Sequence, residues 1–201
     1  MRAGLFESRA ETARSLAAVG AAFVSFQAWG LGAGVTAALV AGVVGMRRGL
    51  PLPLVAAASG AGGSALIHFA VAPEHFAEWW GFGLFFVVCG EVQIGWVLLL
   101  GRFHSRRMPA IGVAGSVFLL LVWALSRTTG LPFGPTPGIP EPVSLPDLVS
   151  ALLECLTAAA CTWALLAPAR LRAGAGIPVR VLIPSAAIAL TAWALVAVGA
   201  A

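Results

Sequence analysis

Long apolar segments alternate with short polar connections along almost the whole chain. After a mixed segment at 1–14, six apolar runs follow, and a helix that crosses a bilayer needs about 20 such residues. They cover about 15–46, 52–72, 76–100, 109–126, 146–167 and 179–199. The first run is long for one span and too short for two. The pattern predicts an all-α fold, an integral membrane bundle of about six transmembrane helices.

Composition supports this assignment to the membrane. Of the 201 residues, 60% are hydrophobic and only 10% are charged, whereas about a quarter of a soluble domain is charged. This excludes a free-standing soluble globule and makes the lipid bilayer the expected partner. The net charge is +4 and every basic residue is Arg. No basic tract is interleaved with aromatic residues, so nucleic-acid binding is not expected.

The chain divides into three regions of different character. Residues 1–14 mix charged and apolar side chains, as a short interfacial helix does. Residues 15–201 form one polytopic transmembrane domain. Within it, 127–145 is a long connection rich in Pro and Gly, which predicts an ordered loop without a helix.

Arginine placement predicts the orientation of the loops. Basic residues follow the first and third apolar runs and separate the fifth from the sixth: Arg47, Arg48, Arg102, Arg106, Arg107, Arg170, Arg172 and Arg180. By the positive-inside rule these loops are cytoplasmic, and the loop at 127–145 faces outward. The absence of Lys, Asn and Tyr fits a high-GC bacterial genome, so we expect a multi-pass protein of the bacterial inner membrane. Arginines in 1–14 oppose this placement and leave the side of the N-terminus open.

A cluster of ionisable residues surrounds the predicted outward turn at 72–78. Pro73 predicts the end of one helix and the first turn of the next. Glu74 and Glu78 would then favour the positive N-terminal end of that next helix. The alternative is that Glu74, His75 and Glu78 join His68 in an outward-facing site for a transition-metal ion or for protons. Their spacing matches no established zinc motif, and both interpretations stay open.

Two carboxylates fall inside apolar runs and are predicted to be buried. Glu91 lies near the middle of the third run, where a carboxylate is costly unless it is paired, protonated or hydrated. It is either functional or part of an interhelical hydrogen bond. Glu154 belongs to a polar stripe on the fifth run, which must face the bundle interior or a cavity. The stripe consists of Asp147, Ser150, Glu154, Thr157 and Cys161.

The two ends of the long loop carry an anchoring pattern. Ser144 and Asp147 are spaced as a capping box at the start of the fifth helix. Arg127, at the end of the fourth run, is predicted to form a salt bridge with Glu141, Asp147 or Glu154. This role fits Arg127 better than substrate binding.

Signals for an enzyme are weak. The three cysteines show no CxxC or other zinc spacing. A pair of Ser64 and His68 lacks the GxSxG elbow of a hydrolase, and no phosphate-binding glycine loop occurs. We therefore lean against an enzyme, and no cofactor beyond a transition-metal ion is suggested.

Two strings resemble recurring features of a family of small multi-span bacterial membrane proteins. They are APEHFAEWWGFGLFF at 72–86 and SRTTGLPFGPTPGIPEPVSLPDLV at 126–149. The resemblance covers roughly the second to fifth apolar runs. It implies a fold of several spans and carries no activity or site residues.

The leading functional hypothesis is a binding or accessory membrane protein with a polar site in the outer half of the bilayer. A structural subunit of a larger membrane complex is the alternative, and a small proton-coupled transporter using Glu91 is a third. Geometry separates them: convergence of His68, Glu91 and Glu154 on one cavity would support a site. If these three side chains instead lie in separate helix–helix interfaces, a structural role is supported.

Overall fold

The computed structural model describes residues 50–103, 105–167, 184, 186–187 and 189–196. These residues contain helices and no strands, which confirms the all-α prediction. Four helices are long and apolar enough to cross a membrane. They are α2 (Leu52–Glu78), α3 (Trp80–Arg102), α4 (Arg107–Thr128) and α5 (Leu145–Leu166). The shortest have 22 residues, about 33 Å of helix, which matches a hydrocarbon core of about 30 Å.

The predicted count of six spans is not confirmed. A further helical stretch at 189–196 falls within the sixth apolar run, and its Thr191 lies against Gly63 of α2. The first apolar run, the interfacial segment at 1–14 and the arginines at 47, 48, 170, 172 and 180 lie outside the described residues.

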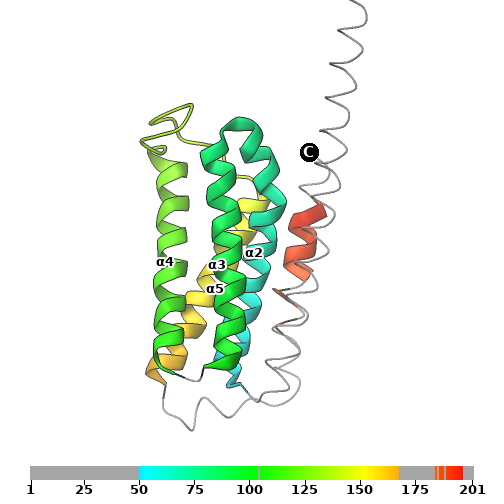
Figure 1. Ribbon diagram of the computed structural model, residues 1–201, viewed down its shortest axis with the longest axis vertical. Coiled ribbons are helices and arrows are strands. Elements are labelled where there is room, and N and C mark those ends of the chain that lie inside the picture. The colour runs from blue at the N-terminus through cyan, green and yellow to red at the C-terminus, as the bar shows by residue number, and fades with distance from the viewer. Residues whose placement is uncertain (1–49, 104, 168–183, 185, 188, 197–201) are drawn as a thin grey trace, which may run out of the picture.

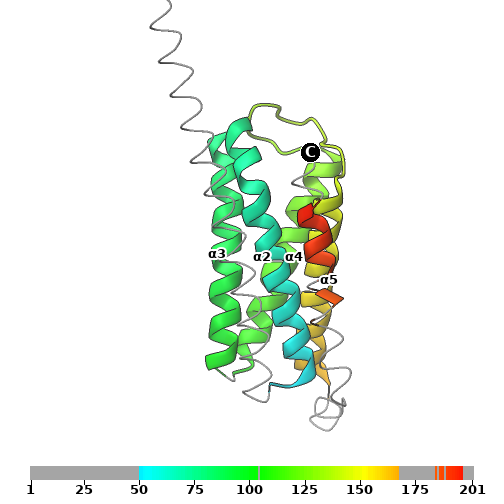
Figure 2. The ribbon, with the colours of Figure 1, turned by 90° about the vertical axis from the view of Figure 1, so that its right-hand side faces the viewer.

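The four long helices form an open arc in the order α3, α2, α5, α4. Helix α2 packs against α3 and α5, and α4 packs against α5, while α3 and α4 scarcely touch (Figure 1). The turn from α2 to α3 and the loop between α4 and α5 lie at the same end of the bundle, called here the loop end (Figures 1 and 2). The connection from α3 to α4 lies at the opposite end.

Small residues set the close approach of α2 to α5. Ala57, Ala61 and Ala65 form a ridge of small residues on α2 that is at most 2% exposed. A Cβ atom added at Gly60 would lie 2.8 Å from the backbone oxygen of Leu153 in α5. The two backbones therefore meet where no larger side chain fits, as in other transmembrane helix pairs.

The turn between α2 and α3 differs from the prediction. Pro73 lies inside α2, which continues to Glu78, and the chain reverses at a single extended residue, Trp79. Glu74 and Glu78 thus occupy the last turns of α2 and do not cap α3. Tertiary packing explains the difference, because Phe76 fills the space beside Gly83 of α3 and holds the turns beyond the proline in place.

The loop at 129–144 contains no helix, as its Pro and Gly content predicts. Gly130 ends α4 with a φ of 73°, a conformation that favours glycine. An added Cβ there would strike the backbone at Gly138 and Ile139, so the loop folds back tightly on its own start. At its tip Phe133 contacts Trp79 and Phe82 of the α2–α3 turn, so the loop lies across the loop end of the bundle.

Candidate functional site

Three helices contribute to a buried hydrogen-bonded chain near the middle of the bundle. His68 of α2 lies 2.9 Å from Gln93 of α3, through Nδ1 and Oε1. Gln93 Nε2 donates to Glu154 Oε1 of α5 at 2.5 Å. The three residues are 6%, 8% and 3% exposed. We call His68, Gln93 and Glu154 the polar chain.

The direction of these hydrogen bonds fixes the tautomer of His68. Gln93 uses its NH2 group toward Glu154, so its carbonyl oxygen faces His68. A carbonyl oxygen only accepts, and His68 Nδ1 must therefore carry the proton. In the neutral ring Nε2 is then free to act as an acceptor.

Two of the three residues that would converge on one cavity in a binding site come together in the structure. His68 and Glu154 meet through Gln93. The prediction that Glu91 is buried is wrong, because Glu91 is exposed on the surface of the described bundle beside Val88 and Val92. Its position follows from helical geometry, since residues two apart on α3 face in different directions and Gln93 takes the inner face.

Gln93 is the site residue that sequence reasoning missed. An amide carries no charge, so the search for ionisable residues in the apolar runs does not select it. The available signal was its position: a buried amide in a transmembrane helix needs partners. It is the one group of the polar chain that offers both a donor and an acceptor, and so it joins an imidazole to a carboxyl group.

A cavity of about 450 Å³ lies between the polar chain and the loop end. Its volume falls within the usual range of about 300–1,000 Å³ for small-molecule sites. Walls from α3 and α4 and a roof from the 129–144 loop are mainly aromatic and apolar. The Phe and Trp residues of the lining are Phe82, Phe85, Phe86, Phe118, Trp123 and Phe133. His68 and Glu154 also line this loop-end cavity.

A second cavity of about 370 Å³ lies deeper between α3 and α4. Glu154, Phe85 and Phe118 line both cavities, so the carboxyl group stands where the two meet. Gln93 and Ser116 also line this mid-bundle cavity. The two cavities fill the space that the open arc leaves between α3 and α4.

Three buried polar atoms at the loop-end cavity have no hydrogen-bond partner among the described residues. They are Glu154 Oε2, Trp123 Nε1 and Arg127 Nε. Buried polar groups in folded proteins are nearly always hydrogen-bonded. All three atoms belong to residues that line the loop-end cavity.

The polar stripe on α5 faces the interior as predicted. Ser150 Oγ lies 2.9 Å from Ser64 Oγ of α2, and Thr157 Oγ1 donates to the Leu153 carbonyl at 2.9 Å. Cys161 is fully buried. Ser150 and Thr157 thus lie against α2, whereas Glu154 bonds to Gln93 of α3 and Cys161 lies beside Gly112 of α4.

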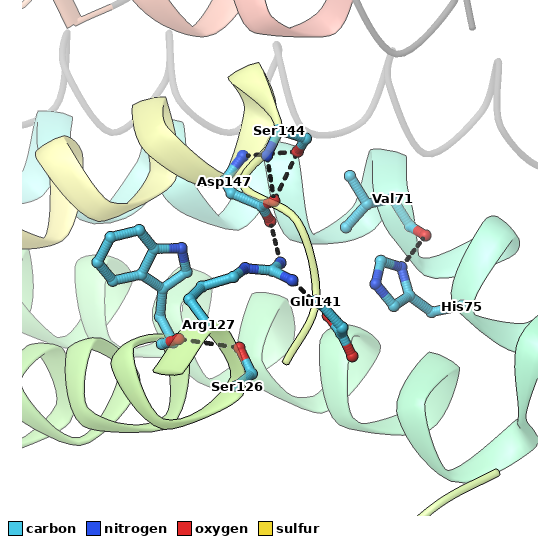
Figure 3. Close-up of polar contacts among 8 residues, drawn as sticks. Val71, His75, Ser126, Arg127, Glu141, Ser144 and Asp147 are labelled. Atoms are coloured by element: carbon cyan, nitrogen blue, oxygen red, sulfur yellow. Dashed lines mark hydrogen bonds and ion pairs between the residues drawn. The ribbon is translucent and has the colours of Figure 1, made fainter. Parts of the chain in front are cut away.

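The loop anchor forms in part as predicted (Figure 3). Arg127 Nη1 contacts Glu141 Oε2 at 2.5 Å, and Nη2 contacts Asp147 Oδ1 at 2.8 Å. Asp147 Oδ2 also accepts from the Ser144 backbone N–H at 2.9 Å, which completes the predicted capping box. Arg127 thus ties the loop and the start of α5 to the end of α4. Glu154, the third partner considered, makes no ion pair with it in the described part of the chain.

The structure separates the four residues considered as metal ligands. His75 Nδ1 donates to the Val71 carbonyl at 2.9 Å, as Figure 3 shows, and its ring contacts Phe86. His68 and His75 line the loop-end cavity, while Glu74 and Glu78 are exposed and do not. Within the described residues no group of three or more His, Cys, Asp or Glu side chains is placed to hold a metal ion.

Comparisons of the chain with protein families, with curated proteins and with solved structures find no match.

Proposed function

We propose that this protein is a membrane-embedded binding protein that holds a small amphiphilic molecule in the loop-end cavity. The observation that carries the proposal is Glu154, which lines a cavity of about 450 Å³ and whose buried Oε2 has no partner among the described residues. A ligand with an apolar body and polar ends would satisfy both the aromatic walls and the polar atoms.

The site lies between helices that scarcely touch, which supports access from the membrane. Loop-end and mid-bundle cavities together follow the α3–α4 gap. Under the positive-inside rule the loop end faces outward, with the 129–144 loop as the roof over the site. A bacterial inner membrane remains the proposed location.

A purely structural role explains less of the geometry. Polar groups that only fix helix register satisfy one another, as Ser64 and Ser150 do. Glu154 uses one oxygen in this way and leaves the other beside a cavity. This difference favours binding over the structural-subunit alternative. The exposed position of Glu91 gives the transporter alternative no comparable support.

Binding of the environment-sensitive dye N-phenyl-1-naphthylamine to the nanodisc-embedded protein tests this proposal. Ala151 lines the loop-end cavity, and Ala151→Phe would fill it. Ala159 is exposed on the same helix, so Ala159→Phe is the matched control. We expect saturable dye fluorescence with the wild type and with Ala159→Phe, and loss of the saturable part with Ala151→Phe. Equal dye binding by all three proteins would contradict the proposal.

A further inference from the structure

We propose that the molecule held in the loop-end cavity is a flat aromatic ring with oxygen substituents at opposite positions, as in a quinone or its quinol. This inference rests on the proposed binding function and names its ligand class. The walls of the cavity, the polar groups at its two ends and the distance between them support this class of ligand.

The walls favour a flat ring. Helix α3 contributes Phe82, Phe85 and Phe86 to one side, and α4 contributes Phe118 and Trp123 to the other. Aromatic rings gain from stacked or edge-to-face contacts with other aromatic rings, beyond the burial of their area. A planar ligand inserted between α3 and α4 can make such contacts on both of its faces.

Residues at the end of the cavity near the loop carry hydrogen-bond donors without acceptors in the described chain. Trp123 Nε1–H and Arg127 Nε–H are both buried without partners in the described chain. An indole N–H and a guanidinium N–H can only donate. A carbonyl or phenolic oxygen accepts from such groups, whereas a hydrocarbon leaves them unsatisfied.

The opposite end presents a carboxyl group. Glu154 Oε1 accepts from Gln93, and Oε2 has no hydrogen-bond partner among the described residues. A phenolic hydroxyl can donate to an ionised carboxylate, and a quinone carbonyl can accept from a protonated carboxyl group. The two redox forms of one ring thus complement the two protonation forms of Glu154.

Helix geometry places the two ends a suitable distance apart. Arg127 contacts Asp147, and Glu154 follows Asp147 by seven residues on α5. At about 1.5 Å per residue, Glu154 lies about 10 Å deeper in the bundle than the ion pair. A six-membered ring with oxygens at opposite corners, plus hydrogen bonds of about 2.8 Å at each end, spans a distance of this order.

Charge in the cavity favours a neutral ligand over an anion. The Arg127 guanidinium is already paired with two carboxylates, Glu141 and Asp147, and offers only Nε to a ligand. An additional negative charge would lie close to both carboxylates. Quinones and quinols are neutral and partition into membranes, which suits access between α3 and α4.

Equilibrium dialysis of the nanodisc-embedded protein tests the ligand class with two matched probes. They are 2,3-dimethyl-1,4-naphthoquinone, whose methyl groups block addition of cysteine thiols, and 2,3-dimethylnaphthalene, which has the same shape without the oxygens. Empty nanodiscs give the partition into lipid. We expect saturable binding of the quinone, about tenfold tighter than binding of the hydrocarbon, because two hydrogen bonds are added.

Two tryptophan variants locate the hydrogen bond. Trp123→Phe keeps an aromatic ring but removes the N–H, and we expect it to weaken quinone binding roughly three- to tenfold without changing hydrocarbon binding. Trp163→Phe is the control, since Trp163 is 55% exposed and lines neither cavity.

The outcomes separate the ligand class from the proposed function. Equal affinity for the two probes, or equal loss of both in Trp123→Phe, would overturn the quinone assignment. So would saturable binding of the naphthylamine dye by a protein that binds neither probe. Both the assignment and the binding function would fall if neither the probes nor the dye bound saturably.

Discussion

At the scale of single residues, Gln93 is the key member of the polar chain. It makes one hydrogen bond to an imidazole and one to a carboxyl group, and all three side chains are buried. Inside a bilayer no water replaces a lost partner, so loss of Gln93 would leave both of its partners unsatisfied. The residue therefore sets both the tautomer of His68 and the orientation of the Glu154 carboxyl group.

Replacing Gln93 should destabilise the fold. Gln93→Leu would leave His68 Nδ1 and Glu154 Oε1 without their present partners, at a cost of about 1–3 kcal/mol. Glu91→Leu, two residues away on the exposed face, is the control and should not destabilise the protein. Reversible unfolding in mixed micelles measures both free energies. If Gln93→Leu proved as stable as Glu91→Leu, the polar chain would not contribute to the stability of the fold.

At this scale the sequence predicted the ionisable residues of the site better than the uncharged polar residue, Gln93. It identified His68 and Glu154 as residues that need partners, and the pairing of Arg127 with Glu141 and Asp147 is confirmed. It did not separate Glu91 from Glu154, because both lie in apolar runs. Only the packing of α3 against α2 decides which side of α3 is inside.

At the scale of elements, the contact between α2 and α5 depends on glycine. An alanine Cβ at Gly60 would lie 2.5 Å from Thr157 Oγ1 and 2.8 Å from the Leu153 backbone oxygen. A backbone oxygen cannot rotate away, so the helices would have to separate. The ridge beside Gly60 sets the position of α5, and with it the depth of Glu154.

Two glycine variants test this contact. Gly60→Ala should destabilise the protein by about 1–3 kcal/mol through overpacking. Gly95 of α3 has no atom within 4 Å of the position of an added Cβ. Gly95→Ala should therefore be neutral or stabilising by up to about 1 kcal/mol, since alanine favours the helix. The same unfolding assay measures both, and equal effects would show that the α2–α5 contact is looser than described.

Helix boundaries were predictable where local signals decide them. The capping box begins α5 at Leu145, and Gly130 follows the end of α4. Pro73 shows the limit of such signals. It predicted a helix end, but α2 continues for five more residues because Phe76 and His75 pack against α3. That packing is a property of the assembled bundle and leaves no local mark in the sequence.

At the scale of the whole molecule, the open arc of helices creates the site. Both cavities exist because α3 packs against α2 and α4 packs against α5, while α3 and α4 scarcely contact each other. Apolar periodicity predicts that helices pack, but it does not predict which pair stays apart. His68 and Glu154 in the inner part of the bundle were predictable from the sequence, whereas Gln93 and the cavity beside them were not.

Photolabelling tests the central claim, that the space between α3 and α4 binds a small molecule. The bilayer-embedded protein is illuminated with a diazirine-bearing naphthylamine, and attachment sites are mapped by mass spectrometry. We predict attachment at cavity residues such as Phe85, Phe118 and Trp123, suppressed by excess unlabelled naphthylamine. Attachment spread over exposed residues such as Leu98 and Trp193, without suppression, would contradict the account.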